Sequence, residues 1–179
     1  RESQRSKNLK KELKKHQTSF SLMKESYFQL QSVDEAKNLT AFLANCFPDP
    51  EQVATGIFEL LLNAIEHGNL GIGYEKKAEL LEKGSWQSFV EERLKLPEFK
   101  NKLVHVHFVR KSDGYYLKIS DHGEGFDWRP HLHLNPSRSK AGHGRGIAHA
   151  NAISFDSVRF NEKGNELIAF VSNNKEISW

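Results

Sequence analysis

The stretch EQVATGIFELLLNAIEHG, residues 51–68, decides the fold because it combines an apolar arc with a polar stripe at helical spacing. The apolar arc consists of Val53, Ile57, Phe58, Leu60, Leu61, Ala64 and Ile65. Glu59, Asn63 and Glu66 lie three and four residues apart, so their side chains leave one face of a helix. We expect a helix from Glu51 to His67 that Gly68 ends. Surface helices often carry such a stripe, so the stretch alone does not indicate a binding site.

Two glycine-rich motifs follow this helix. The first, Asp121-His-Gly123-Glu-Gly125-Phe-Asp127, comes after two period-two runs, residues 104–109 and 115–120, which a turn at 111–114 joins into a predicted hairpin. Asp121 is therefore expected at the end of a strand. The second motif, residues 142–147 (Gly-His-Gly-Arg-Gly-Ile), precedes a predicted helix over 144–153. The unpaired N–H groups of a helix N-terminus favour an anion such as a phosphate.

The remaining elements predict an α+β protein. Residues 20–30 alternate loosely, as in one strand or two, and Ser32 or Asp34 caps a helix that runs to Cys46. Two further strands over 157–160 and 167–172 form a closing hairpin. Residues 71–101 are predicted to be an insertion with helices around 75–81 and 86–96. This pattern favours a two-layer α/β sandwich, with a mixed sheet covered by helices on one face.

The order and spacing of the three motifs resemble the ATP-binding domain of the GHKL superfamily, which takes in DNA gyrase, sensor histidine kinases and MutL. The resemblance covers roughly residues 20–172 and implies the Bergerat-type ATP-binding fold. Within the superfamily the chain is most similar to the anti-sigma-factor serine/threonine kinases. The features that carry this closer likeness are the His67-Gly68 pair, the short gap between the glycine motifs, Arg145 in the second, and the run from Phe160 to Glu166.

The resemblance implies a Mg-ATP site, and the chemistry of the side chains suits it. Mg²⁺ prefers oxygen ligands, and the amide oxygen of Asn63 is one. Glu59, one helical turn earlier, is expected to act as a general base beside the γ-phosphate. Asp121 accepts hydrogen bonds only, which suits the amino group of adenine. The expected nucleotide-binding residues are Asn63, His67, Asp121, Gly123, Gly125, Gly142, His143, Gly144, Arg145, Gly146 and Ile147.

Arg145 from this set and Asn165 outside it carry further expectations. Arg145 is also expected to be catalytic, because its guanidinium can stabilise the charge that spreads over a phosphoryl group during transfer. Asn165 departs from the family pattern, in which a glycine-threonine pair often supplies a hydroxyl for adenine.

These expectations amount to a serine/threonine protein kinase of the anti-sigma-factor type, a transferase that uses ATP and Mg²⁺. Its phosphoacceptor would be a small protein like an anti-sigma-factor antagonist in a bacterial partner-switching pathway, with a sigma or anti-sigma factor as a further partner and a homodimer as an expected form. Two alternatives stay open. One is a nucleotide-dependent protein-binding module with little catalysis, and the other is the catalytic domain of a sensor histidine kinase.

Composition limits the other classes of function. The chain has 179 residues, of which 37% are hydrophobic and 27% charged, as is usual for one globular domain. Its net charge of +3 comes largely from lysines and arginines before residue 16, so we expect no nucleic-acid surface on the domain. No apolar run approaches membrane-span length, and we expect no membrane partner. The single cysteine, Cys46, cannot form an internal disulfide, which favours the cytoplasm.

We expect two parts in the chain. Residues 1–17 are predicted to be a linker helix from an upstream domain, consistent with the versions of these kinases that are fused to a response regulator and phosphatase. Residues 18–179 are predicted to form the ATPase domain itself, with the helical insertion at 71–101.

Overall fold

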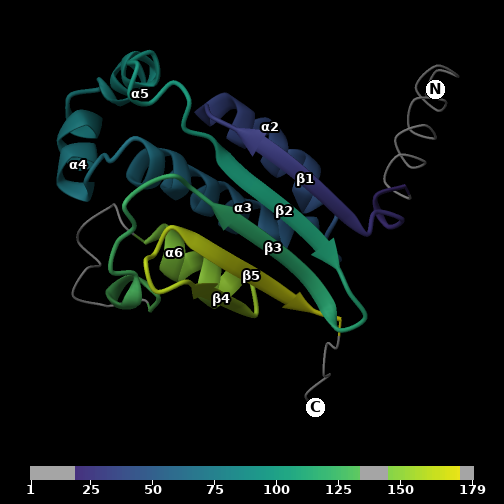
Figure 1. Ribbon diagram of the computed structural model, residues 1–179. Coiled ribbons are helices and arrows are strands. Elements are labelled where there is room, and N and C mark those ends of the chain that lie inside the picture. Colours follow the sequence, from purple (N-terminus) through teal and green to yellow (C-terminus); the bar gives the residue numbers. More distant parts are fainter. Residues whose placement is uncertain (1–18, 134–144, 174–179) are drawn as a thin grey trace, which may run out of the picture.

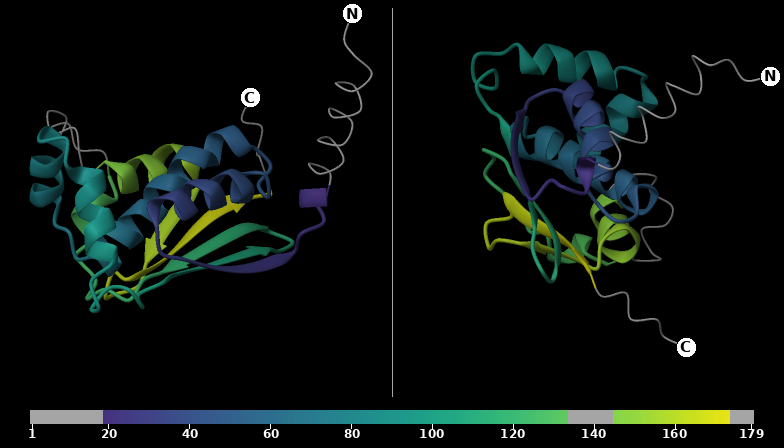
Figure 2. Two further views of the ribbon diagram at one scale, coloured as in Figure 1. Left: turned by 90° about the horizontal axis from the view of Figure 1, so that it is seen from above. Right: turned by 90° about the vertical axis from the view of Figure 1, so that its right-hand side faces the viewer.

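The computed structural model describes residues 19–133 and 145–173, and it shows an α+β fold of two layers (Figure 1). One layer is a five-stranded sheet in the order β1-β2-β3-β5-β4. The strands are β1 (Glu25–Leu30), β2 (Val104–Arg110), β3 (Gly114–Ser120), β4 (Ser157–Phe160) and β5 (Glu166–Ser172). The helices lie together on one face of this sheet (Figure 2). The predicted two-layer sandwich is therefore confirmed.

The helical layer contains two long helices and several shorter segments. The long helices are α2 (Val33–Ala44) and α3 (Pro50–Asn63), and α3 continues into a π-helical turn, η1 (Ala64–Asn69). The shorter segments are α4 (Tyr74–Glu82), α5 (Trp86–Leu94), a 3₁₀ turn η2 (Arg129–His131), α6 (Gly146–His149) and a second π-helical turn η4 (Ala150–Ser154). The predicted helices of the segment 71–101 are present as α4 and α5. The predicted linker helix over residues 1–17 lies outside the described residues.

Local sequence signals fix the starts of the two long helices. Ser32 caps α2 through a reciprocal capping box, in which its hydroxyl accepts from the Glu35 N–H and the Glu35 carboxylate accepts from the Ser32 N–H. Asp49 caps α3 by accepting from the Gln52 N–H, and Pro50 occupies the first helical position, where no donor is needed. Of the two candidate caps for the first helix, Ser32 is the one used.

The prediction of a mixed sheet is wrong, because all four strand pairings are antiparallel. Four helices, α2, α3, α4 and α5, lie between β1 and β2 in the chain, and β2 returns antiparallel to β1. β4 follows the helical segments η2, α6 and η4, and it runs in the same direction as β3. The two are not neighbours, however, because β5 lies between them and is antiparallel to both.

Other boundaries also differ from the prediction. The helix expected to end at Gly68 ends as α3 at Asn63, and the π-helical turn η1 continues through Gly68 to Asn69. Residues 19–23 form a tight turn, with the Leu22 N–H donating to the Ser19 carbonyl, and only 25–30 form a strand. The helix expected over 144–153 begins at Gly146 and widens into the π-helical turn η4. Both hairpins lie where the sequence places them, with β2 and β3 joined through residues 111–113 and β4 and β5 through 161–165.

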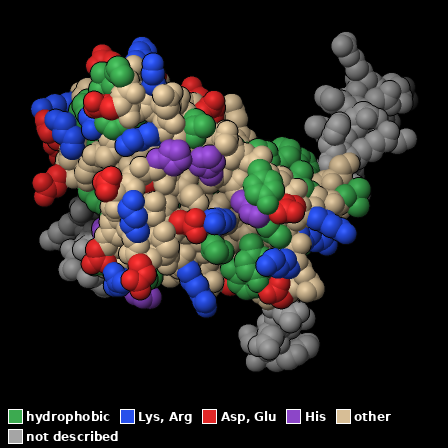
Figure 3. Space-filling view, in the orientation of Figure 1, with side chains coloured by type: hydrophobic (Ala, Val, Ile, Leu, Met, Phe, Trp, Pro, Cys, Tyr) green, Lys and Arg blue, Asp and Glu red, His purple; other side chains and the backbone are tan. Residues whose placement is uncertain are grey.

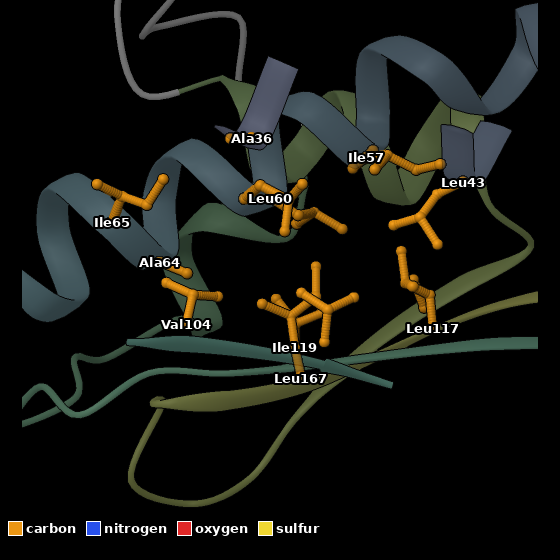
Figure 4. Close-up of a cluster of buried hydrophobic side chains, with 14 of the residues drawn as sticks. Ala36, Leu43, Ile57, Leu60, Ala64, Ile65, Val104, Leu117, Ile119 and Leu167 are labelled. Carbon is orange, nitrogen blue, oxygen red and sulfur yellow. The ribbon is translucent and has the colours of Figure 1, made fainter. Parts of the chain in front are cut away.

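The core lies between the two layers. Leu43 from α2 and Ile57, Leu60 and Ile65 from α3 and η1 point at the inner face of the sheet (Figure 4). They pack against the central strands, whose buried residues include Val104, Val106, Phe108, Leu117, Ile119, Leu167 and Ala169. The opposite face of the sheet has no helical cover from the described residues, and histidine side chains gather on it (Figure 3).

We predict that Phe108→Ala destabilises the fold by about 3–5 kcal/mol, because it removes a fully buried ring from the centre of the core. The matched control is Ile168→Ala on the uncovered face of the sheet, where the side chain is 41% exposed. We expect it to change stability by less than about 1 kcal/mol. Urea unfolding followed by circular dichroism measures both. Equal losses for the two variants would contradict this placement of the core.

Candidate functional site

One pocket joins residues of all three motifs. Its lining comes from the end of α3 and η1, from the turn after β3, from the start of α6 and from the β4–β5 hairpin. The pocket lies between the helical layer and the end of the sheet at which β3 terminates. The lining residues include Asn63, His67, Gly68, Tyr74, Ile119, Asp121, Gly125, Phe126, Ile147, Gly164, Asn165 and Leu167.

Asp121 lies at the centre of this arrangement. It follows β3 directly, and its main-chain N–H donates to the Asn165 carbonyl at 2.9 Å, which ties the turn to the β4–β5 hairpin. One carboxylate oxygen, Oδ1, accepts from the Gly123 N–H at 2.8 Å. Burial raises the pKa of Asp121 to about 6, although the Gly123 N–H and the charges of Lys163 and Lys102 act in the opposite direction. Among the described residues, the Gly123 N–H is the donor to this half-buried carboxylate.

Glycines allow the backbone to pack against this carboxylate. A Cβ atom on Gly68 would lie 2.4 Å from Asp121 Cγ, and one on Gly123 would lie 2.4 Å from the Gly68 carbonyl oxygen. Gly125 has a φ of 80°, and its Cβ would lie 1.8 Å from the Lys163 carbonyl oxygen. The glycines of the first motif are thus required by close packing between the end of α3 and the β4–β5 hairpin.

The end of α3 is shaped by the π-helical turn η1. The Ile72 N–H donates to the Glu66 carbonyl at 2.8 Å, and the Asn69 side chain accepts from the His122 N–H at 2.7 Å. Asn69 thereby fixes the turn that holds Asp121. Nothing in the spacing of the motifs predicted this role. The sequence signal is an amide side chain directly after the stretch that the helical period explains; its burial is seen only in the structure.

His67 faces the pocket in a neutral state. Its Nδ1 atom donates to the Ile72 carbonyl, which can only accept, so the proton is on Nδ1 and Nε2 is left as an acceptor. Burial lowers the pKa of His67 to about 4, although the hydrogen bond to the Ile72 carbonyl acts in the opposite direction; the charges of Lys77 and His131 also lower it. Within the described part of the chain, Nε2 is buried without a hydrogen-bond partner.

Asn63 and Glu59 occupy different places relative to the pocket. Asn63, the last residue of α3, lines it. Glu59 lies one turn earlier, and its Oε2 atom would be 2.3 Å from a Cβ atom on Gly146. Glu59 is therefore packed against the first residue of α6, at the margin of the pocket. This contact joins the helix that carries Glu59 and Asn63 to the second glycine motif, residues 142–147.

The structure describes only half of the second glycine motif, residues 142–147. Arg145 directly precedes α6, which begins with Gly146, and Ile147 lines the pocket. The other three predicted residues, Gly142, His143 and Gly144, lie outside the described residues. Asn165 lines the pocket and is oriented by Asn161, whose amide donates to Asn165 Oδ1 at 2.9 Å.

Tyr74 and Phe126 line the pocket although the sequence analysis did not select them. Tyr74 is the first residue of α4, and thus comes from the segment interpreted as an insertion. The sequence signal for Tyr74 is its position as an aromatic residue directly after Gly73 and close to Gly71, where the chain turns away from α3. Phe126 lies inside the first glycine motif and makes an edge contact with Phe160 at 5.6 Å between ring centroids.

No protein-family model matches the chain, and no curated protein matches its sequence. Among residues 19–133 and 145–173, no helix has both the length and the apolar character needed to cross a bilayer.

We predict that Gly68→Ala destabilises the protein by about 1–3 kcal/mol, because the new methyl group overlaps the Asp121 carboxylate. Gly73→Ala is the matched control, since it lies five residues along the chain and a Cβ there has no neighbour within 4 Å. We expect Gly73→Ala to stay within about 0.5 kcal/mol of the wild type in urea unfolding. A Gly68→Ala variant as stable as the control would show that Asp121 does not pack as described.

Proposed function

We propose that the chain binds Mg-ATP and acts as a serine/threonine protein kinase of the anti-sigma-factor type in the cytoplasm. The observation that carries the proposal is the half-buried carboxylate of Asp121 in a pocket shared with Asn63. Burying an acceptor that lacks donors is unfavourable, so a ligand that donates a hydrogen bond there gains affinity. The amino group of adenine is such a donor.

The chemistry of the residues that line the pocket suits ATP and Mg²⁺. Ile119, Leu167 and Phe126 provide apolar surface for a planar base next to Asp121, and apolar walls with a few polar groups are typical of such sites. Asn63 would hold Mg²⁺ through its amide oxygen, together with phosphate oxygens and water. When bound, Mg²⁺ would neutralise phosphate charge and orient the phosphates.

Glu59 and Arg145 would carry the transfer step in this proposal. The step moves the γ-phosphoryl group of ATP to a serine or threonine hydroxyl of a small antagonist protein, and the bond to ADP breaks as the new P–O bond forms. Glu59 would accept the hydroxyl proton. Arg145, beside the start of α6, would stabilise the charge on the transferred group. The anti-sigma-factor-antagonist phosphoacceptor and the sigma or anti-sigma partner belong to the same proposal.

A nucleotide-dependent binding module is the second candidate, and one observation favours it. The carboxylate of Glu59 packs against Gly146 at the margin of the pocket and does not line it. A protein that only holds or releases a partner according to nucleotide occupancy needs Asp121 and Asn63, but it does not need a base at position 59.

We predict that Asn63→Ala weakens ATP binding about tenfold or more in the presence of Mg²⁺, because the metal loses its protein ligand. With excess chelator the variant and the wild type should bind ATP with affinities within about twofold, since Asn63 then has no metal to hold. Isothermal titration calorimetry under both conditions measures the difference. An unchanged affinity for Mg-ATP would rule out the metal-binding role.

Substituting Glu59 separates the two candidate functions. If Glu59 is the base, Glu59→Gln should keep the nucleotide affinity and lose about 10²–10⁴-fold in transfer rate. Transfer is measured with γ-labelled ATP as label on serine or threonine of a co-purified protein. Glu51→Gln, on the exposed first turn of the same helix, is the control and should transfer at the wild-type rate. Equal rates for all three proteins would favour the binding module.

The pH dependence of binding tests Asp121. Because burial raises its pKa to about 6, the carboxyl is protonated in the free protein below that pH and ionised above it. A donor from the ligand favours the ionised form, so affinity should be constant above about pH 7 and fall by up to about tenfold per unit below about pH 6. Asp121→Asn should lack this step. A pH dependence of affinity that the wild type and Asp121→Asn share arises from the nucleotide. Identical pH profiles for the two proteins would exclude Asp121 as the acceptor.

A further inference from the structure

The segment 71–101 is fastened to the same turn that carries His67. Lys77 Nζ lies 2.5 Å from Glu66 Oε2, and the Glu66 side chain is only 1% exposed. Arg93 Nε donates to the Leu70 carbonyl at 2.7 Å. A buried ion pair of this kind holds its partners together, because separating them leaves a buried charge without compensation. The segment therefore cannot shift without disturbing η1.

Tyr74 brings this segment into the pocket. Its ring centroid lies 4.0 Å from that of His67 and 5.1 Å from that of His131. His131 in turn lies 5.7 Å from Phe126. Tyr74, His67 and Phe126 all line the pocket. The rings thus come from three stretches of chain, η1, the start of α4 and the segment after β3, and they form one aromatic wall.

The chemistry of the wall suits one end of a nucleotide. Aromatic rings present flat apolar surface that packs well against other planar groups. The neutral imidazole of His67 adds an acceptor and no positive charge. A polyphosphate would need cations or N–H donors in that position. The wall is therefore matched to a base and ribose, while the phosphates are matched to Asn63 through Mg²⁺.

We propose that Tyr74, contributed by the segment 71–101, is a specificity-determining residue that contacts the base and ribose of the nucleotide and holds His67 against them. This inference rests on the proposed function, because it assigns a role within the same pocket. It also gives the segment a part in the binding site, beyond packing on the outside of the fold.

The test compares Tyr74→Ala, Tyr74→Phe and the control Leu81→Ala, which alters an exposed side chain on the same helix. Calorimetry with ATP, ADP and AMP gives three affinities for each protein. Tyr74→Ala should weaken all three by about tenfold, because each ligand carries the same base and ribose. Tyr74→Phe keeps the ring and should restore binding to within about threefold. Leu81→Ala should match the wild type.

Several outcomes would overturn this inference. Wild-type protein that binds none of the three nucleotides refutes the proposed function itself. If the wild type binds and Tyr74→Ala binds equally well, the proposed function stands and the role of Tyr74 is refuted. A loss confined to ATP would place Tyr74 at the phosphates and also refute it. Should Tyr74→Ala lower the unfolding midpoint, the same comparison is made with Tyr74→Leu, which removes the ring but keeps an apolar side chain in its place.

Discussion

The structure depends on the packing of the Asp121 carboxylate against the backbone at the end of α3. Gly68 leaves just enough room for the carboxylate, and Gly123 approaches the Gly68 carbonyl equally closely. This contact joins the helical layer to the sheet at the edge where β3 ends. It also removes the carboxylate partly from water, which raises the pKa of Asp121 to about 6. One contact therefore sets both the geometry and the electrostatics of the pocket.

Much of the fold could be predicted because its elements follow simple periods. The apolar arc of α3, the alternation of β2 and β3 and the turn signals of both hairpins each follow from residues close in sequence. The mixed sheet was wrong for a non-local reason: the order of the strands depends on β5 entering between β3 and β4. Similarly, the period of α3 could not reveal the π-helical turn η1, which depends on Asn69 bonding to the His122 N–H.

The candidate site could be predicted where motifs supply its residues. Asn63, His67, Asp121, Gly125 and Ile147 line one pocket, as the order of the motifs suggested. Glu59 contacts Gly146 beside it. Tyr74 could not be found in this way, because it belongs to no motif and reaches the pocket through the ion pair of Glu66 with Lys77. The walls of the pocket are set by tertiary contacts, whereas its polar groups are set by local sequence.

The central claim is that the end of α3, the turn after β3 and the β4–β5 hairpin bind one nucleotide together. Titrating Mg-ATP into ¹⁵N-labelled protein and following the backbone amide resonances tests it most directly. We predict that the amides of residues 63–68, 121–126 and 164–165 shift together, with a common dissociation constant. An unchanged spectrum, or shifts confined to the uncovered face of the sheet around His105 and His107, would contradict the account.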